Sequence, residues 1–233
     1  MRRRVIEAPL EILCDFDGTI ASIDTVDFLL ERLADPGWRI LEEQWIRGEI
    51  DSSACMTAQI ALVRGGWRAI RRALEEVRLD PGFARFASWC RASRIPLRVV
   101  SEGIEQVIIH LLRREAVLVD EVWAPRLSER SNETLELRLP APGSALCGAA
   151  LCKCVFVTTA ASPPFRVLIG DGRSDFCISR RVDLVVASSK LAIHCEQNDL
   201  AFQPFVGFDD VRHLLEKRNS IGVRAVAPTG APS

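Results

Sequence analysis

The sequence predicts an α/β fold in which a doubly wound parallel sheet carries a helical lid inserted after its first strand. Short apolar runs alternate with segments of helical periodicity, which is the pattern of a parallel sheet covered by helices on both faces. Three of the runs end in a polar side chain, at Asp15, Ser101 and Asp171. A long helical block separates the first two of these ends, and this block is the candidate lid.

The first strand is expected at residues 10–16, which read Leu-Glu-Ile-Leu-Cys-Asp-Phe and precede the turn residue Gly18. Such a Rossmann-like sheet places the carboxyl ends of its strands along one edge, where ligands bind. We therefore expect the three polar ends to meet there. The other strands are predicted at residues 97–100, 121–124, 134–139, 166–170 and 183–187.

Between the first two strands the periodicity is helical throughout. Apolar residues recur at spacings of three and four in residues 26–33. Asp80 and Pro81 predict the start of a further helix, with Asp80 as its N-cap and Pro81 at its first position.

These patterns divide the chain into a core, an insertion and a tail. The core is expected from residues 1–23 and 95–218, and the helical lid from residues 24–94. Residues 219–233 are rich in Ala, Pro and Gly, which predicts a flexible tail.

Composition excludes several classes of partner. The formal net charge is -1, so the basic excess of a nucleic-acid-binding surface is absent. No window approaches the ~20 apolar residues of a membrane span, and no apolar signal core follows the basic start before Asp15. We therefore expect a cytoplasmic protein without nucleic-acid or membrane partners, of unknown oligomeric state. Eight cysteines in such a chain favour reduced thiols over disulfides.

Two carboxylates leave the first strand together, in Cys14-Asp15-Phe16-Asp17-Gly18-Thr19. Their burial costs desolvation free energy unless a bound cation and an incoming phosphate offset it. Asp15 can attack phosphorus as a nucleophile. Asp17 can protonate the leaving alkoxide and later deprotonate water, which requires a raised pKa. The alternative is an Asx-type turn that only ends the strand.

A second acidic cluster, Asp171 and Asp175, lies in Gly-Asp-Gly-Arg-Ser-Asp. Magnesium prefers hard oxygen ligands, and Asp15, the backbone carbonyl of Asp17 and Asp171 form a partial set. Asp175, one helical turn further on, is a further or outer-shell ligand. The sequence therefore predicts a Mg²⁺ cofactor, with a helix N-cap at Asp171 or Ser174 as the simpler alternative.

Attack of a carboxylate on a phosphate brings like charges together, so positive or hydrogen-bonding groups are needed. Ser101 ends a strand and begins a helix, where its hydroxyl and the following amides can hold phosphate oxygens. Lys153 stands alone in an apolar run, and the acidic cluster is its obvious partner. Simple N-capping by Ser101 and a surface position for Lys153 are the alternatives.

Asp-Phe-Asp-Gly-Thr, a strand ending in Ser, a lone Lys and Gly-Asp-Gly-x-x-Asp follow one another over residues 11–175. In this order they resemble the four motifs of the haloacid dehalogenase-like superfamily. The helical insertion resembles the lid of its phosphoserine-phosphatase-like branch. The resemblance implies the following roles: Asp15 as nucleophile, Asp17 as acid and base, Ser101 and Lys153 as phosphate binders, Asp171 as Mg²⁺ ligand and Asp175 as support of the metal site.

Several residues depart from the phosphoserine phosphatases. The second motif reads Ser101-Glu102-Gly103, where Ser-Gly-Gly is commoner, and Asp24 stands where those enzymes carry a Glu. Arg-Ser replaces the usual Ala-Asn before Asp175. We place Glu102, Gly103 and Asp24 among the candidate substrate-binding residues.

The cysteine-rich approach to Lys153 is similar to the enolphosphate phosphatase of methionine salvage. The resemblance implies a Mg²⁺-dependent phosphomonoester hydrolase that acts on a small phosphorylated metabolite, such as that enolphosphate, through an aspartyl-phosphate intermediate. Three alternatives stay open: a phosphoserine phosphatase, a phosphotransferase to an alcohol, and a catalytically silent phosphate-binding regulatory protein.

The region around Lys153 allows other interpretations. Cys147, Cys152 and Cys154 can be read as a thiolate zinc site, but their spacing is unusual and a fourth ligand is not evident. We interpret the latter two as packing around Lys153. Residues 155–159 read as a strand, whereas the family expects a helix there. The histidines fall outside the motifs, so we expect structural or surface roles for His110, His194 and His213.

Overall fold

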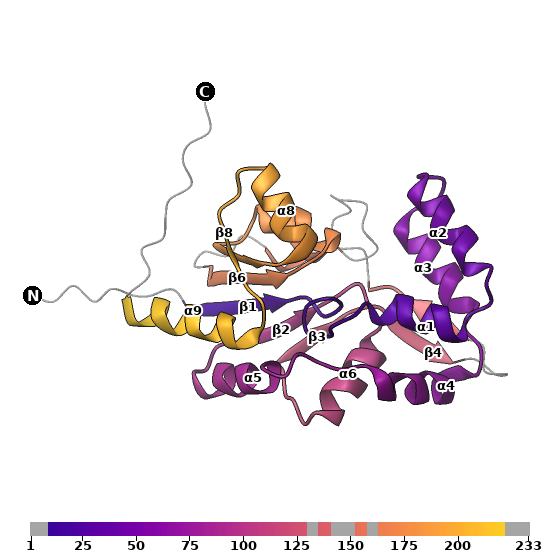
Figure 1. Ribbon diagram of the computed structural model, residues 1–233, viewed down its shortest axis with the longest axis horizontal. Coiled ribbons are helices and arrows are strands. Elements are labelled where there is room, and N and C mark those ends of the chain that lie inside the picture. Colours follow the sequence, from indigo (N-terminus) through magenta and orange to yellow (C-terminus); the bar gives the residue numbers. More distant parts are fainter. Residues whose placement is uncertain (1–8, 130–134, 141–151, 158–162, 222–233) are drawn as a thin grey trace, which may run out of the picture.

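The computed structural model describes residues 9–129, 135–140, 152–157 and 163–221 (Figure 1). Six parallel strands form the central sheet: β1 (Leu10–Cys14), β2 (Leu97–Val100), β3 (Glu121–Trp123), β6 (Phe165–Gly170), β7 (Leu184–Ala187) and β8 (Phe202–Pro204). Their spatial order is β3-β2-β1-β6-β7-β8. The chain runs outward in one direction from β1 and in the other from β6, so the sheet has its topological switch point between these two strands.

The predicted doubly wound sheet is confirmed, and two strands were not predicted. β8 is short, partly exposed and at the sheet edge, so it lacks the apolar run that marks a buried strand. β4 (Arg126–Glu129) pairs antiparallel with β5 (Leu135–Arg138) in a separate ribbon. Residue 134 of the predicted strand lies outside the described residues.

Helices cover both faces of the sheet (Figure 1). α5 (Phe83–Ala92), α6 (Glu105–Arg114) and α9 (Phe208–Ile221) lie on one face, and α7 (Phe176–Ser179) and α8 (Ser189–Gln197) on the other. Neighbouring residues of β1 point to opposite faces. Ile12 accordingly belongs to the apolar cluster beneath the first group of helices, and Leu13 to the cluster beneath the second.

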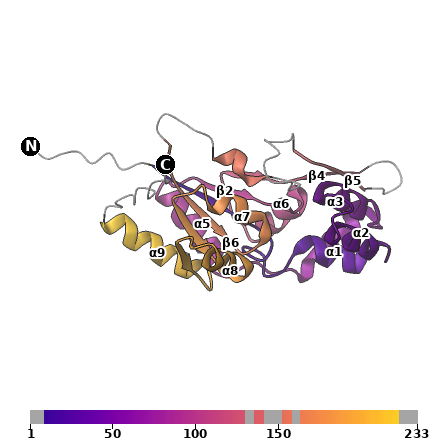
Figure 2. The ribbon, with the colours of Figure 1, turned by 90° about the horizontal axis from the view of Figure 1, so that it is seen from above.

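Between β1 and α5 the chain forms α1 (Thr25–Leu33), α2 (Trp38–Ile46), α3 (Ser52–Ala61), α4 (Gly66–Ala73) and the 3₁₀ turn η1 (Leu74–Glu76). α1, α2 and α3 group beyond one end of the sheet in both views (Figure 2). The chain enters and leaves this insertion side by side. The Ser22 amide donates to the Arg78 carbonyl at 3.3 Å, and the Asp80 amide donates to the Ile20 carbonyl at 2.8 Å. β5 packs against α3.

The boundary between core and insertion differs from the expected one. α5 falls within the predicted lid range 24–94, yet it packs against α9 and β2 of the core. The physical reason is an aromatic cluster, in which Phe208 of α9 lies 4.7 Å from Phe83 and 5.2 Å from Phe86 between ring centroids. The spacing of apolar residues within α5 cannot show that this helix packs against α9, which comes from the other end of the sequence.

Two further helix ends differ from prediction. α5 begins at Phe83 and its N-cap is Gly82, so Asp80 is not the cap. The Asp80 carboxylate instead accepts hydrogen bonds from the amides of Gly82 and Phe208, linking this turn to the start of α9. α9 continues to Ile221, so the tail predicted from residue 219 does not begin there, and residues 222–233 lie outside the described part.

The packing of the sheet and its helices predicts that alanine substitutions destabilise the protein far more at buried apolar positions than at exposed ones. Ile169 of β6 is fully buried, so Ile169→Ala is expected to lower the free energy of unfolding by about 2–5 kcal/mol. Ile193 of α8 is 54% exposed, and Ile193→Ala is expected to change it by less than about 0.5 kcal/mol. Urea denaturation of both variants measures the difference, and equal losses would contradict this packing.

Candidate active site

The candidate active site begins where β1 and β6 end. The two strands are parallel neighbours, with Cys14 opposite Ile169, and the Asp15 amide donates to the Ile169 carbonyl at 2.9 Å. Asp15 and Asp171 therefore leave adjacent strands at the switch point of the sheet. This confirms that residues 156 positions apart share one edge.

The turn after β1 is wound tightly around the carbonyl of Phe16, which accepts from the amides of Thr19, Ile20 and Ala21. Gly18 has φ +70°, and a Cβ at this position would collide with the Asp171 carboxylate. Glycine therefore lets the first turn approach the second motif. The Thr19 hydroxyl then donates to Asp171 Oδ1 at 2.8 Å.

Lys153 lies at the centre of the acidic groups. It begins the 3₁₀ turn η2 (Lys153–Phe156), and only 1% of it is exposed. Its Nζ lies 2.8 Å from Asp15 Oδ2 and 2.8 Å from Asp175 Oδ1. The predicted meeting of lysine and acidic cluster is thus present in the structure, and the surface alternative for Lys153 is wrong.

Burial and neighbouring charges shift the pKa values of Lys153 and Asp175 in opposite directions. Burial alone would lower the pKa of Lys153, but the carboxylates of Asp15 and Asp175 outweigh it and raise the pKa above its usual range. Burial raises the pKa of Asp175, while the Lys153 ammonium opposes that rise. The ammonium therefore remains charged, and it compensates carboxylates that would otherwise be costly to bury.

Three carboxylates make a candidate metal centre. Asp15, Asp171 and Asp175 each offer an oxygen, and these atoms lie within 4.8 Å of one another. Burial is the largest cause that raises the pKa of Asp171, and the charge of Asp15 adds to it. A divalent cation would offset both the desolvation of Asp171 and its repulsion by Asp15. Mg²⁺ prefers hard oxygen ligands such as carboxylates. The donor set therefore fits the predicted ion; the carbonyl of Asp17 as a ligand stays a prediction.

The Asp17 carboxyl group contacts the first residue of α1 and the residue that follows β2. Its Oδ1 accepts from the Thr25 amide at 2.8 Å, and its Oδ2 lies 3.5 Å from the Ser101 hydroxyl. Burial, followed by the charge of Asp24, raises the pKa of Asp17 to about 8. A carboxyl group with this pKa holds a proton at neutral pH that it can donate.

The second motif surrounds Asp17. Ser101 follows β2 and is 1% exposed, and its hydroxyl oxygen accepts from the Gly103 amide at 2.9 Å. A Cβ at Gly103 would collide with Asp17 Oδ2, so this position needs glycine for the close approach. Glu102 lines the same cavity as Asp15.

Asp24 is the N-cap of α1, where its carboxylate accepts from the amides of Val26 and Asp27. It also faces the cavity, and burial raises its pKa. The sequence placed Asp24 near the substrate, and the structure brings it to the same cavity as Asp15 and Ser101.

A cavity of about 740 Å³ lies between this edge of the sheet and the inserted helices. Four predicted site residues line it from the core side: the catalytic candidates Asp15 and Asp17, the phosphate-binding candidate Ser101 and the metal-ligand candidate Asp171. The opposite side is formed by the insertion, including Val26 of α1, Trp45 of α2 and Met56 of α3. The inserted helices therefore contribute side chains to the cavity at this edge of the sheet.

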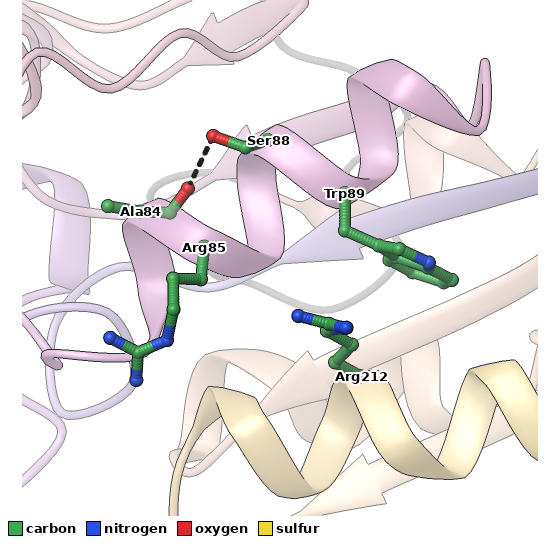
Figure 3. A pocket seen from close by; sticks show the side chains of 5 residues that line it. All are labelled: Ala84, Arg85, Ser88, Trp89 and Arg212. Carbon is green, nitrogen blue, oxygen red and sulfur yellow. Dashed lines mark hydrogen bonds between the residues drawn. The ribbon is translucent and has the colours of Figure 1, made fainter.

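A second hollow of about 490 Å³ lies elsewhere, between α5 and α9 (Figure 3). Its lining comprises Ala84, Arg85, Ser88, Trp89 and Arg212. Arg85 is paired with Asp209, and Arg212 with Glu216. This hollow contains none of the motif residues.

Sequence reasoning missed several supporting groups. It considered Ser174 only as a cap, but the Ser174 hydroxyl donates to Asp15 Oδ2 at 3.1 Å. Thr19 was noted only as part of a motif, and the amide of Thr25 was not considered. Thr19 and Ser174 could have been identified as hydrogen-bond donors from their positions within the two acidic motifs. Thr25 could not, because it lies eight residues from Asp17 and only the folded chain brings the two together.

The remaining predictions near this site have mixed outcomes. Lys153 to Phe156 form a 3₁₀ turn, so the strand predicted at residues 155–159 is wrong for residues 155–157, while residues 158–159 and Cys147 lie outside the described part. His110 contacts Trp67 edge-on, and His194 stacks on Phe176. Within the described residues, no histidine lines the catalytic cavity.

Comparison with known proteins identifies the family to which the chain belongs. A model of the haloacid dehalogenase-like hydrolases matches residues 12–180. The chain belongs to this family. A relative from Brevibacillus brevis, named 2-hydroxy-3-keto-5-methylthiopentenyl-1-phosphate phosphatase, is 30% identical over 89% of this chain and 96% of its own length. A protein of the same name from Geobacillus kaustophilus is 28% identical over 91% of this chain and 98% of its own.

Solved structures of this haloacid dehalogenase-like hydrolase fold confirm the architecture. A family hydrolase from Salmonella enterica serovar Typhi has a TM-score of 0.71 at 18% identity and covers 92% of this chain and 74% of its own. A phosphoserine phosphatase described as a phospho-aspartyl intermediate analogue has a TM-score of 0.63 at 16% identity, covering 91% and 99%. The match to the family model confirms the family resemblance drawn from the four motifs, and the solved structures confirm the fold.

The Lys153 ion pairs predict a stability effect that depends on charge. In the presence of a chelator, Lys153→Met leaves buried Asp15 and Asp175 uncompensated and is expected to lower the free energy of unfolding by about 3–5 kcal/mol. With Lys153 present, burial raises the pKa of Asp175 to about 8, and without the ammonium this pKa would rise further. The deficit should therefore grow between about pH 7 and pH 10, where the folded wild-type carboxyl group loses its proton and that of the variant keeps it.

Lys217→Met is the matched control, because Lys217 is exposed on α9 and its substitution should change stability by less than about 0.5 kcal/mol. Addition of Asp175→Asn to Lys153→Met should restore part of the loss. Denaturant titrations across this pH range measure both effects, and a deficit that is independent of pH would contradict the charge argument.

Proposed function

We propose that this hydrolase-family protein is a Mg²⁺-dependent phosphomonoesterase that forms an aspartyl phosphate on Asp15. The observation that supports it most is the buried contact of 2.8 Å between Lys153 Nζ and Asp15 Oδ2 at the switch point of the sheet. A carboxylate held beside a fixed cation can meet an anionic ester without the full cost of charge repulsion. The names of the relatives, both phosphatases, support the same reaction.

Asp15 would act as the nucleophile. The Phe16 amide donates to its Oδ1 at 2.7 Å, while Lys153 and Ser174 contact its Oδ2. These contacts hold the carboxylate in one orientation at the cavity wall. Attack on phosphorus forms a bond from a carboxylate oxygen and breaks the bond to the leaving alkoxide.

Asp17 would give its proton to that alkoxide, and its carboxylate would then take a proton from the water that hydrolyses the aspartyl phosphate. Ser101, the Gly103 amide and Lys153 would hold phosphate oxygens. Asp15, Asp171 and Asp175 would hold Mg²⁺, which supplies positive charge to the phosphoryl group when bound.

The inserted helices would act as the lid and supply substrate contacts. Val26, Trp45 and Met56 bring apolar and thioether surface to a cavity whose opposite wall is acidic. This combination suits a small phosphorylated metabolite with an apolar end. It supports the enolphosphate named for the relatives, 2-hydroxy-3-keto-5-methylthiopentenyl-1-phosphate, as the substrate.

We further propose a cytoplasmic protein whose partner is this small metabolite, without nucleic-acid or membrane partners. The nearly balanced charge supports the exclusion of nucleic acid. In the described part of the chain, no helix combines the length and apolarity needed to cross a membrane.

Phosphate release from a generic aryl phosphate tests the reaction. Release is expected with Mg²⁺, to stop with EDTA and to return when Mg²⁺ is restored. Asp15→Asn should reduce release to background with the fold retained, and ³²P label from substrate should appear on the wild-type protein only. Metal-independent release, or full activity of Asp15→Asn, would refute the proposed mechanism. Added alcohols that collect the phosphate would reveal a transferase.

Substrate choice is tested with Trp45→Ala. For the enolphosphate, loss of apolar contact is expected to lower kcat/KM about 10- to 100-fold, mainly through KM. Trp89→Ala, in the separate hollow between α5 and α9, is the matched control and should leave both constants unchanged. Equal effects of the two substitutions, or a higher kcat/KM for phosphoserine than for the enolphosphate, would count against this substrate.

A further inference from the structure

Three cysteine side chains converge in the segments that carry Lys153 and its partner Asp175. Cys152 and Cys154 flank the lysine, and Cys177 of α7 follows soon after its partner Asp175. The three Sγ atoms lie within 4.8 Å of one another, and Cys154 Sγ lies 3.3 Å from Cys177 Sγ. The sequence suggested a set with Cys147, which lies outside the described residues, whereas the third thiol comes from a segment 23 residues after Cys154.

Packing alone does not require this arrangement. Cys152 and Cys154 are buried in the apolar cluster beneath α7 and α8, where a thiol serves as a small hydrophobic group. Cys195 of α8 is fully buried in the same cluster but is not one of the three converging thiols. Hydrophobic contact has no preference for sulfur beside sulfur, so their convergence calls for a different explanation.

The group has the size and chemistry of a thiolate metal site. A tetrahedral zinc ion with bonds of about 2.3 Å to sulfur places its sulfur ligands about 3.8 Å apart. The observed separations require only small adjustments of the side chains. Cys177 is partly exposed, so an ion can enter from solvent and keep a water molecule as its fourth ligand.

We propose that Cys152, Cys154 and Cys177 bind one thiophilic divalent cation of the Zn²⁺ class. Binding converts three thiols to thiolates and releases three protons. The ion would tie η2 to α7, and thereby hold Lys153 against Asp15 and Asp175. Its ligands are soft sulfur atoms, so this site selects a different metal from the carboxylate centre, which offers only oxygen.

Co²⁺ and Zn²⁺ test the site by spectroscopy and stoichiometry, without relying on activity. Reduced, metal-free full-length protein should bind one Co²⁺ with a thiolate-to-cobalt charge-transfer band in the near ultraviolet. One equivalent of Zn²⁺ should remove this band and raise Tm. Excess Mg²⁺ should not compete, since carboxylate-bound cobalt gives no sulfur band.

Matched alanine variants assign the ligands. Cys154→Ala and Cys177→Ala should lose the band and weaken Zn²⁺ binding about 100-fold or more. Cys195→Ala should keep the charge-transfer band and the Zn²⁺ affinity of the wild type. Circular dichroism checks that each variant is folded. A band retained in Cys154→Ala and Cys177→Ala, or absent from the wild type, would overturn the proposal. So would rapid peroxide oxidation of Cys154 and Cys177 to a disulfide in protein that binds no Zn²⁺.

Discussion

The structure depends on one buried ammonium group between two carboxylates. Lys153 comes from a short turn, Asp15 from the end of β1 and Asp175 from the segment after β6, so a single side chain unites three parts of the chain. None of these groups is readily buried alone, because removal of an isolated charge from water is costly. Together they form a compensated group that constrains the fold, and in the proposed function the same group receives the anionic ester.

The sheet topology explains why the charges gather at this point. The strand order reverses between β1 and β6, and in parallel sheets such a reversal leaves a crevice beyond the carboxyl ends of the two strands. The insertion begins just after β1, and its two connections run side by side near Ser22 and Arg78. An insertion anchored at this position can cover the crevice, while α5, which follows it, packs against α9 of the core.

Two aspartates in one motif acquire different environments. Asp15 faces Lys153 and the other metal-ligand candidates, whereas Asp17 faces Asp24, the Thr25 amide and Ser101. Burial beside another carboxylate favours the protonated form of Asp17. These different surroundings support the proposed division between Asp15 as nucleophile and Asp17 as proton donor.

The sequence by itself determined the parallel sheet, the inserted helices and the group of Asp15, Lys153 and Asp171, because local periodicity and motif order encode these features. It did not determine the strand order, the β4–β5 ribbon, the place of α5 in the core, or Thr19 and Ser174 as hydrogen-bond donors to the acidic groups. Nor did it place Cys177 beside Cys154. These features depend on contacts between distant segments, which form only when the whole apolar core assembles and which local sequence patterns do not encode.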